Sequence, residues 1–212
     1  MYYPNFLPHH NQPMLLTEAE HQHPQQVIVA FFECYHLVDA RRSLKRCLKA
    51  AFSHRRLRRK GLLDIIALRE ALLRLLEAAT LLRDEGKAAL PEDEPDPLNP
   101  LWYLGRNTGE HTHWDYLPRH LSQKQYRNPY RVFHQCARKS TLPLWRGLLE
   151  GLVAAASYAN MHGEDGCIPY SDKEPCARAQ CSRLVQLVEA AHLVYVRERL
   201  GEQEQQNVKK CA

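Results

Sequence analysis

The 212-residue sequence predicts an all-α fold: a helical bundle built from two diverged tandem helical repeats, related by a pseudo-twofold axis and joined by an acidic, proline-rich linker. Three observations favour this fold. Glycine is scarce, at nine residues, whereas helix-forming Leu, Ala, Arg and Glu are abundant. The chain aligns with itself at a nearly constant offset. Two long segments carry apolar residues at helical spacing, which is typical of helices that bury one face.

The self-alignment pairs residues 13–52 with residues 118–157 without a gap, at an offset of 105 residues. Nine of these 40 positions are identical; in the first copy they are Pro13, Leu16, Pro24, Val27, Leu37, Arg41, Leu44, Ala50 and Ala51. Residues 75–81 align with residues 187–193 at an offset of 112, so the second copy has gained seven residues in its last loop. We therefore expect both copies to fold into the same helical unit.

Both copies open with the same helix-start signature. Thr17 is followed by Glu20, and Ser122 is followed by Gln125. In each pair the hydroxyl can cap a free backbone N–H while the longer side chain reaches back to the start of the turn. We expect a short helix after each cap.

Prolines mark where the next helix begins. Pro24 and Pro129 stand at this point in the two copies, because proline suits the first helical turn and disfavours helical geometry just before it. In the second copy, the sequence Ser140-Thr141-Leu142-Pro143 predicts a further stop and restart. By analogy, we expect the helix of the first copy to break near residues 36–39.

The last helix of each copy is predicted to be amphipathic. In the first copy, Asp64, Arg69, Arg74 and Glu77 flank an apolar stripe. We expect both stripes to face the core of a bundle in which the two copies pack on each other. The stripe residues are Ile65, Leu68, Leu72, Leu75, Leu76, Ala79 and Leu82 in the first copy and Leu184, Leu187, Val188, Ala191 and Tyr195 in the second.

Composition also predicts how the chain is divided. Four prolines between residues 91 and 100, among acidic residues, exclude a regular helix and indicate an exposed linker. Two tryptophans and two tyrosines follow, so we expect this stretch to dock on the bundle. The predicted segments are a tail (1–12), the first repeat (13–86), the linker with its docked aromatic loop (87–117), the second repeat (118–200) and a C-terminal tail (201–212).

The cysteines and the apolar segments indicate the cellular setting. Seven cysteines, an odd number at irregular spacing, do not suggest a disulfide framework. The chain does not start with a cationic stretch followed by an apolar one, and no segment approaches the roughly 18 apolar residues of a membrane span. We expect a cytoplasmic protein with reduced thiols, no membrane association and no cofactor.

The strongest charge feature is residues 41–60, which hold ten cations and no acidic residue. On a helix, Leu44, Cys47, Leu48 and Ala51 would face the core while the cations face solvent. Such a surface can neutralise the phosphates of nucleic acid or receive an acidic protein. The alternative is a solvated face partly neutralised by the acidic linker. The ten cations are Arg41, Arg42, Lys45, Arg46, Lys49, Arg55, Arg56, Arg58, Arg59 and Lys60.

The segment Arg106-Asn107-Thr108-Gly109-Glu110-His111 places an arginine and a histidine with four residues between them, and a polar residue follows the arginine. It resembles the Arg-polar-x3-His signature of HEPN ribonucleases, helical-bundle proteins in which these two residues are associated with metal-independent RNA cleavage. The resemblance implies Arg106 and His111 as catalytic residues. It covers six residues, and Gly109 departs from the helical setting of the family.

Two groups of side chains have the chemistry of metal ligands. His111, His113 and Asp115 lie within five residues of one another. A second group, near the last loop of the second copy, lacks the tight C-x2-C spacing of recognised zinc sites, so we expect no resident metal. Its members are His162, Cys167, Cys176 and Cys181.

These features favour a non-enzymatic helical binding protein whose basic helix contacts nucleic acid or an acidic protein. One alternative is the HEPN-like ribonuclease. Another is a structural module that associates with a copy of itself or with another helical protein. No Gly-rich phosphate loop, G-x-S-x-G elbow or HExxH motif occurs in the sequence, so enzyme activity is the less favoured interpretation.

Overall fold

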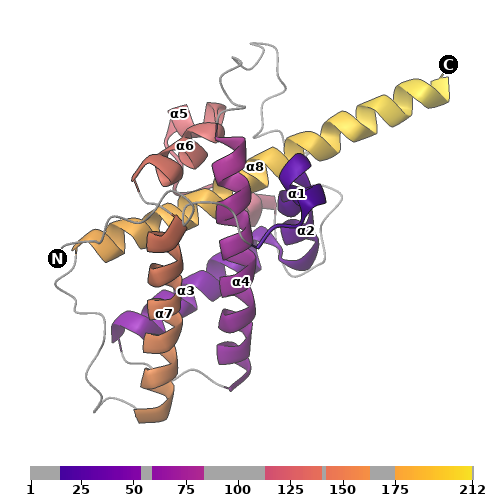
Figure 1. The fold of residues 1–212 in the computed structure, drawn as a ribbon. Coiled ribbons are helices and arrows are strands. Elements are labelled where there is room, and N and C mark those ends of the chain that lie inside the picture. Colours follow the sequence, from indigo (N-terminus) through magenta and orange to yellow (C-terminus); the bar gives the residue numbers. More distant parts are fainter. Residues whose placement is uncertain (1–14, 54–58, 84–112, 140–141, 163–174, 212) are drawn as a thin grey trace.

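A computed structural model describes residues 15–53, 59–83, 113–139, 142–162 and 175–211 (Figure 1). These residues form helices without any strand, which confirms the predicted all-α class. We call residues 15–83 the first half and residues 113–211 the second half.

The described residues of the first half form four helices. A capping box formed by Thr17 and Glu20 starts the short α1 (Glu18–Gln22). Pro24 is the N-cap of α2 (Gln25–Cys34), as predicted. The chain then becomes extended at Tyr35, and α3 (Leu37–Ser53) follows, so the helix break lies at residues 35–36, at the edge of the predicted range. The half ends with α4 (Arg59–Leu82).

The second half begins with a 3-10 turn, η5 (His113–Tyr116), followed by α5 (Gln123–Arg127). Ser122 and Gln125 form a capping box at the start of α5. Next come α6 (Tyr130–Lys139) and α7 (Leu142–His162), which separate at the predicted stop. The long α8 (Pro175–Cys211) ends the half, and its C-terminal part extends away from the other helices (Figure 1).

One continuous apolar core joins the two halves. Helix α4 packs on α6 and α7 of the second half, and α8 packs on α2 and α3 of the first. Helices α3 and α7 also pack on each other. Both predicted stripes are buried, including Leu75 and Leu187, which are fully inaccessible to solvent. Burying these apolar faces against one another provides the main driving force for folding.

Of the predicted aromatic loop, the structure describes the last residues, which include Tyr116. Its side chain is buried and stacks on the His192 ring, with the ring centroids 6.3 Å apart. The tryptophan and tyrosine at positions 102 and 103 lie outside the described residues. Within the part of the chain that the structure describes, no helix combines the length and the apolar character needed to cross a membrane.

Candidate functional site

A strip of cations lies along the outer face of α3. Arg42, Lys45, Arg46 and Lys49 are exposed, at positions i, i+3, i+4 and i+7 of the helix. This spacing puts them on one face, over about 10 Å of helix length. The opposite face is buried and includes Leu44, Cys47 and Ala51, as the sequence predicts, with Leu48 partly buried. We call the four exposed cations the α3 strip.

Arg41 begins the same basic run but has a different environment. Its side chain is only 12% exposed. One guanidinium nitrogen, Nη1, lies 3.0 Å from Oε1 of Glu189 and 2.9 Å from the carbonyl oxygen of Leu117. The other, Nη2, donates to the carbonyl oxygen of Asp115. Arg41 therefore links α3 to α8 and to the chain that follows η5, while the α3 strip faces outward.

Glu189 is the centre of this internal contact. Its side chain is fully buried on α8. Besides Arg41, it accepts hydrogen bonds from the backbone N–H groups of Arg119, at 3.0 Å, and His120, at 2.8 Å. The His120 ring nitrogen Nδ1 lies 3.0 Å from Glu189 Oε1. A buried carboxylate needs this number of donors, because an unpaired buried charge is strongly destabilising.

Glu77 forms an equivalent contact on α4. Its side chain is 1% exposed, and its Oε1 lies 2.6 Å from Nη2 of Arg146 on α7. Its Oε2 accepts a hydrogen bond of 2.7 Å from the backbone N–H of Leu15. The expectation that Glu77 flanks the apolar stripe on its polar side is wrong, because an arginine from the other half neutralises it within the core. Each buried glutamate thus takes its arginine partner from the opposite half.

The α3 strip is not repeated at the positions of α7 that align with it in the sequence. At an offset of 105 residues, the four strip positions correspond to Gly147, Glu150, Gly151 and Ala154. Glu150 is exposed, as are Gly147 and Ala154. The α3 strip therefore has no counterpart at the aligned positions of α7.

The remaining predicted binding and catalytic residues lie wholly or partly outside the described residues. Arg55, Arg56 and Arg58 lie outside the described residues, as do Arg106 and His111. The backbones of Arg59 and Lys60 belong to the first turn of α4, but their side chains are not described.

The candidate metal ligands do not come together in the described part of the chain, where no three His, Cys, Asp or Glu side chains are grouped as a metal site. Cys167 and the side chains of His162 and Cys176 lie outside the described set. Cys181 is buried close to Cys47, and burial raises the pKa of each thiol to about 12. The Cys181 sulfur is therefore held as a protonated core thiol, whereas metals bind the thiolate.

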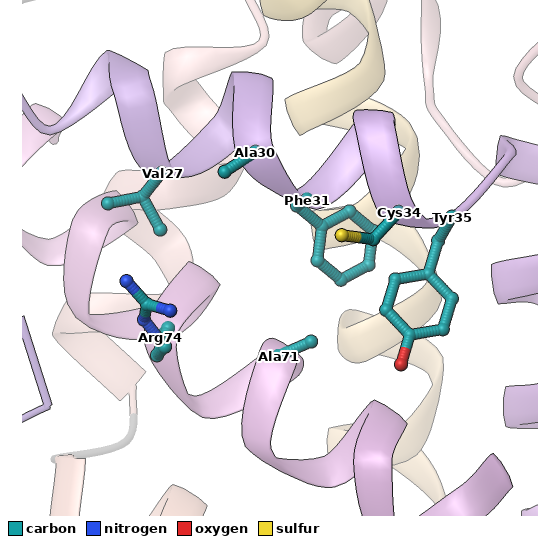
Figure 2. A pocket seen from close by; sticks show the side chains of 7 residues that line it. All are labelled: Val27, Ala30, Phe31, Cys34, Tyr35, Ala71 and Arg74. Atoms are coloured by element: carbon teal, nitrogen blue, oxygen red, sulfur yellow. The ribbon is translucent and has the colours of Figure 1, made fainter.

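A small apolar cavity of about 120 Å³ lies between α2 and α4 (Figure 2). Phe31, Cys34 and Tyr35 line it on the α2 side, facing Ala71 and Arg74 of α4. Burial raises the pKa of the Tyr35 hydroxyl, with the nearby Cys34 and Asp64 adding to the effect. Arg74 is paired with Glu20 of α1. The lining is mostly apolar, so it offers space for a small apolar group but no set of catalytic side chains.

Comparison of the chain with protein-family models, with curated proteins and with solved structures finds no match.

Proposed function

We propose that this protein is a helical binding protein that contacts the phosphate backbone of nucleic acid through the α3 strip. The observation that carries the proposal is the exposure of four cations on one helix face, while the neighbouring Arg41 is used inside the fold. Cations held at the surface of a packed helix can neutralise phosphates without distorting the core. The contact is with phosphates, so it does not distinguish base sequences.

The character of this surface favours phosphates over an acidic protein partner. Protein interfaces depend on a few large, well-packed anchors surrounded by polar residues. Among the described residues, the exposed large apolar side chains are Leu15, Leu63 and Ile66, none of which is on α3. A surface of cations without an apolar anchor suits a partner that presents regularly spaced negative charges. The sequence prediction also includes the cations at positions 55, 56 and 58–60 in this contact.

Charge reversal tests this proposal. The variant Arg42→Glu, Lys45→Glu, Arg46→Glu removes three exposed cations without touching the core. Because each phosphate contact releases counterions, we expect at least about 100-fold weaker binding of a fluorescent RNA or DNA oligomer at 50 mM salt.

The matched control changes the same net charge elsewhere. Lys124→Glu, Arg127→Glu, Arg131→Glu reverses three exposed cations on α5 and α6. Under the same conditions this variant should bind within about threefold of the unmodified protein. Equal weakening by the two variants would mean that only overall charge matters, and unchanged binding by the α3 variant would reject the proposed surface.

A second candidate function is self-association. Leu63 and Ile66 on α4 are 62% and 41% exposed, and neighbouring apolar side chains at the surface can form a contact between copies. Light scattering at low and high salt tests this candidate. A dimer that resists salt and is lost in Leu63→Ser, Ile66→Ser would support it, whereas a monomer at both salt concentrations would reject it.

We also propose that the two halves are diverged copies of one helical unit, related by a pseudo-twofold axis. The two capping boxes, the lengths of α2 and α6, and the exchanged Arg–Glu pairs support this proposal. Arg41 and Arg146 are aligned in the sequence, and so are Glu77 and Glu189. On this basis, the α3 strip is a specialisation of the first copy.

The free thiols of Cys34, Cys47, Cys136 and Cys181 fit a cytoplasmic location.

A further inference from the structure

His120 differs from the other groups around Glu189, because its side chain is half exposed while the carboxylate that it contacts is fully buried. The aligned position in the first half is Leu15, which keeps the backbone contact to Glu77 but has no ring. Both halves therefore have a contact between a backbone N–H and a buried glutamate, and the second half adds an imidazole to it.

The contacts of Glu189 determine which ring nitrogen of His120 carries a proton. The Arg41 guanidinium and the backbone N–H groups of Arg119 and His120 can only donate to the carboxylate, so Glu189 acts as an acceptor. Nδ1 of His120 must then donate to Glu189 Oε1, across 3.0 Å. In the neutral ring, the free electron pair is left on Nε2. A histidine oriented by a buried carboxylate in this way is arranged as a general base.

The nearest hydroxyl along the chain is not available as a nucleophile. Ser122 Oγ lies 3.0 Å from Gln125 Oε1 and accepts from the Gln125 backbone N–H within the capping box. A reaction at His120 would therefore use a nucleophile supplied by the substrate. RNA is a phosphate polymer that carries one, the 2′-hydroxyl, next to each phosphodiester.

The position of His120 relative to α3 connects it to the proposed binding surface. His120 Nδ1 and Arg41 Nη1 both lie 3.0 Å from Glu189 Oε1, so these two nitrogens are no more than about 6 Å apart. Lys45 of the α3 strip follows Arg41 by one helical turn, and its side chain is exposed where that of Arg41 points into the fold. A strand bound along the α3 strip can thus extend past His120.

We propose that His120 is a catalytic base for cleavage of single-stranded RNA bound on the α3 strip, with Glu189 as its positioning residue. Nε2 takes the proton of a 2′-hydroxyl, O2′ forms a bond to phosphorus, and the bond from phosphorus to O5′ breaks. The leaving O5′ takes a proton from water, and the hydroxide that remains removes the proton from Nε2, which restores the neutral ring. The products are a 2′,3′-cyclic phosphate and a free 5′-hydroxyl, and no oxidant, reductant or metal takes part. This inference rests on the proposed binding of nucleic acid.

The test measures binding and cleavage of the same fluorescent RNA by the full-length protein, with a 2′-O-methyl RNA of equal sequence as the control. We expect both oligomers to bind and only the unmodified one to be cut. General base catalysis contributes roughly 10²–10⁴-fold, so His120→Ala should cut at least about 100-fold more slowly while binding is retained. Added imidazole should restore part of the activity of His120→Ala, because the site is open to solvent.

Two further variants separate catalysis from structure. His120→Asn keeps a donor for Glu189 but has no basic nitrogen, so it should remain folded and inactive. His134→Ala, an exposed histidine on α6, should cut normally. The proposal is overturned if the protein binds RNA without cutting it, if His120→Asn is as active as the unmodified protein, or if only His111→Ala abolishes cutting. Failure to bind RNA at all would instead overturn the proposed function.

Discussion

Two glutamates in the core, Glu77 and Glu189, are the residues whose environment departs most from the amphipathic pattern of their helices. Each is almost inaccessible to solvent and faces an arginine from the other half of the chain. In a core, the attraction within such a pair offsets the cost of removing the charges from water only when both partners are present.

Removing one arginine should therefore be costly. Arg146→Ala removes the arginine that pairs with the buried Glu77 carboxylate, and we expect a loss of about 3–5 kcal/mol in the free energy of unfolding. Arg74→Ala is the control, because Arg74 is 39% exposed in its pair with Glu20, and its loss should be about 1 kcal/mol or less. Urea denaturation followed by circular dichroism measures both. Equal losses in the two variants would contradict the assigned role of the buried pair.

The cysteines provide a second test at this scale. Burial raises the pKa values of Cys47, Cys136 and Cys181 to about 12, whereas Cys34 is exposed. The reactive species is the thiolate, whose fraction at pH 8 falls to about 10⁻⁴ for a pKa of 12. We expect iodoacetamide to label Cys34 in the folded protein and the three buried thiols only after unfolding in urea. Peptide mass mapping checks this, and rapid native labelling of Cys136 would contradict it.

The residue-level environments were only partly predictable from the sequence. The apolar stripe residues were identified because their spacing alone determines which face they share. The burial of Glu77 and Glu189 was not predicted. Helical periodicity alone assigns a charged residue next to an apolar stripe to the solvent-exposed face. Their recurrence at aligned positions within Leu-Leu-Glu-Ala-Ala and Leu-Val-Glu-Ala-Ala was the available signal. Their partners, Arg41 and Arg146, were aligned as well, but pairing across the halves depends on tertiary structure.

At the scale of elements, local signals determined where helices begin. Thr17 and Ser122 form the predicted capping boxes, and the prolines mark the following helices. These boundaries depend on a few adjacent residues, so the sequence was sufficient to predict them. The orientation of α3 was less predictable, because its basic run is uniform in sequence while Arg41 is turned inward by α8 and by the chain after η5.

The cap of α5 gives a matched pair of variants. Ser122→Ala removes the oxygen that accepts from Gln125 N–H and should lower the free energy of unfolding by about 1 kcal/mol. Ser122→Gly should cost only a few tenths of a kcal/mol, because glycine is itself tolerated at N-caps. The difference is measured by urea denaturation of both variants. If alanine is no worse than glycine, the cap does not stabilise α5.

At the scale of the whole molecule, the two halves share one core and exchange their charged partners, so neither is complete alone. We expect residues 1–86 and residues 87–212, produced as separate chains, to be largely unfolded individually and to gain helix when mixed. Circular dichroism and size-exclusion chromatography of the separate and mixed chains test this. A cooperative unfolding transition for either chain alone would contradict the mutual dependence of the halves.

The asymmetry between the halves is the basis of the functional account, since the cations of α3 have no counterpart on α7. The sequence located this charge but could not show that Arg41 is used inside the fold or that His120 lies beside it. Both facts follow from contacts between residues more than 60 positions apart. A cluster of cations can be identified from a short stretch of sequence. Which of these cations are exposed depends on how the helices pack.

The most direct test of the central claim is the salt dependence of nucleic-acid binding by the unmodified protein, titrated from 50 to 200 mM salt. Neutralising about four phosphates predicts that the logarithm of the binding constant falls against the logarithm of salt concentration with a slope of about −3 or steeper. This slope should become shallower in the variant Arg42→Glu, Lys45→Glu, Arg46→Glu. Absence of binding at 50 mM salt, or a slope near zero, would contradict the assignment of the α3 strip as a phosphate-binding surface.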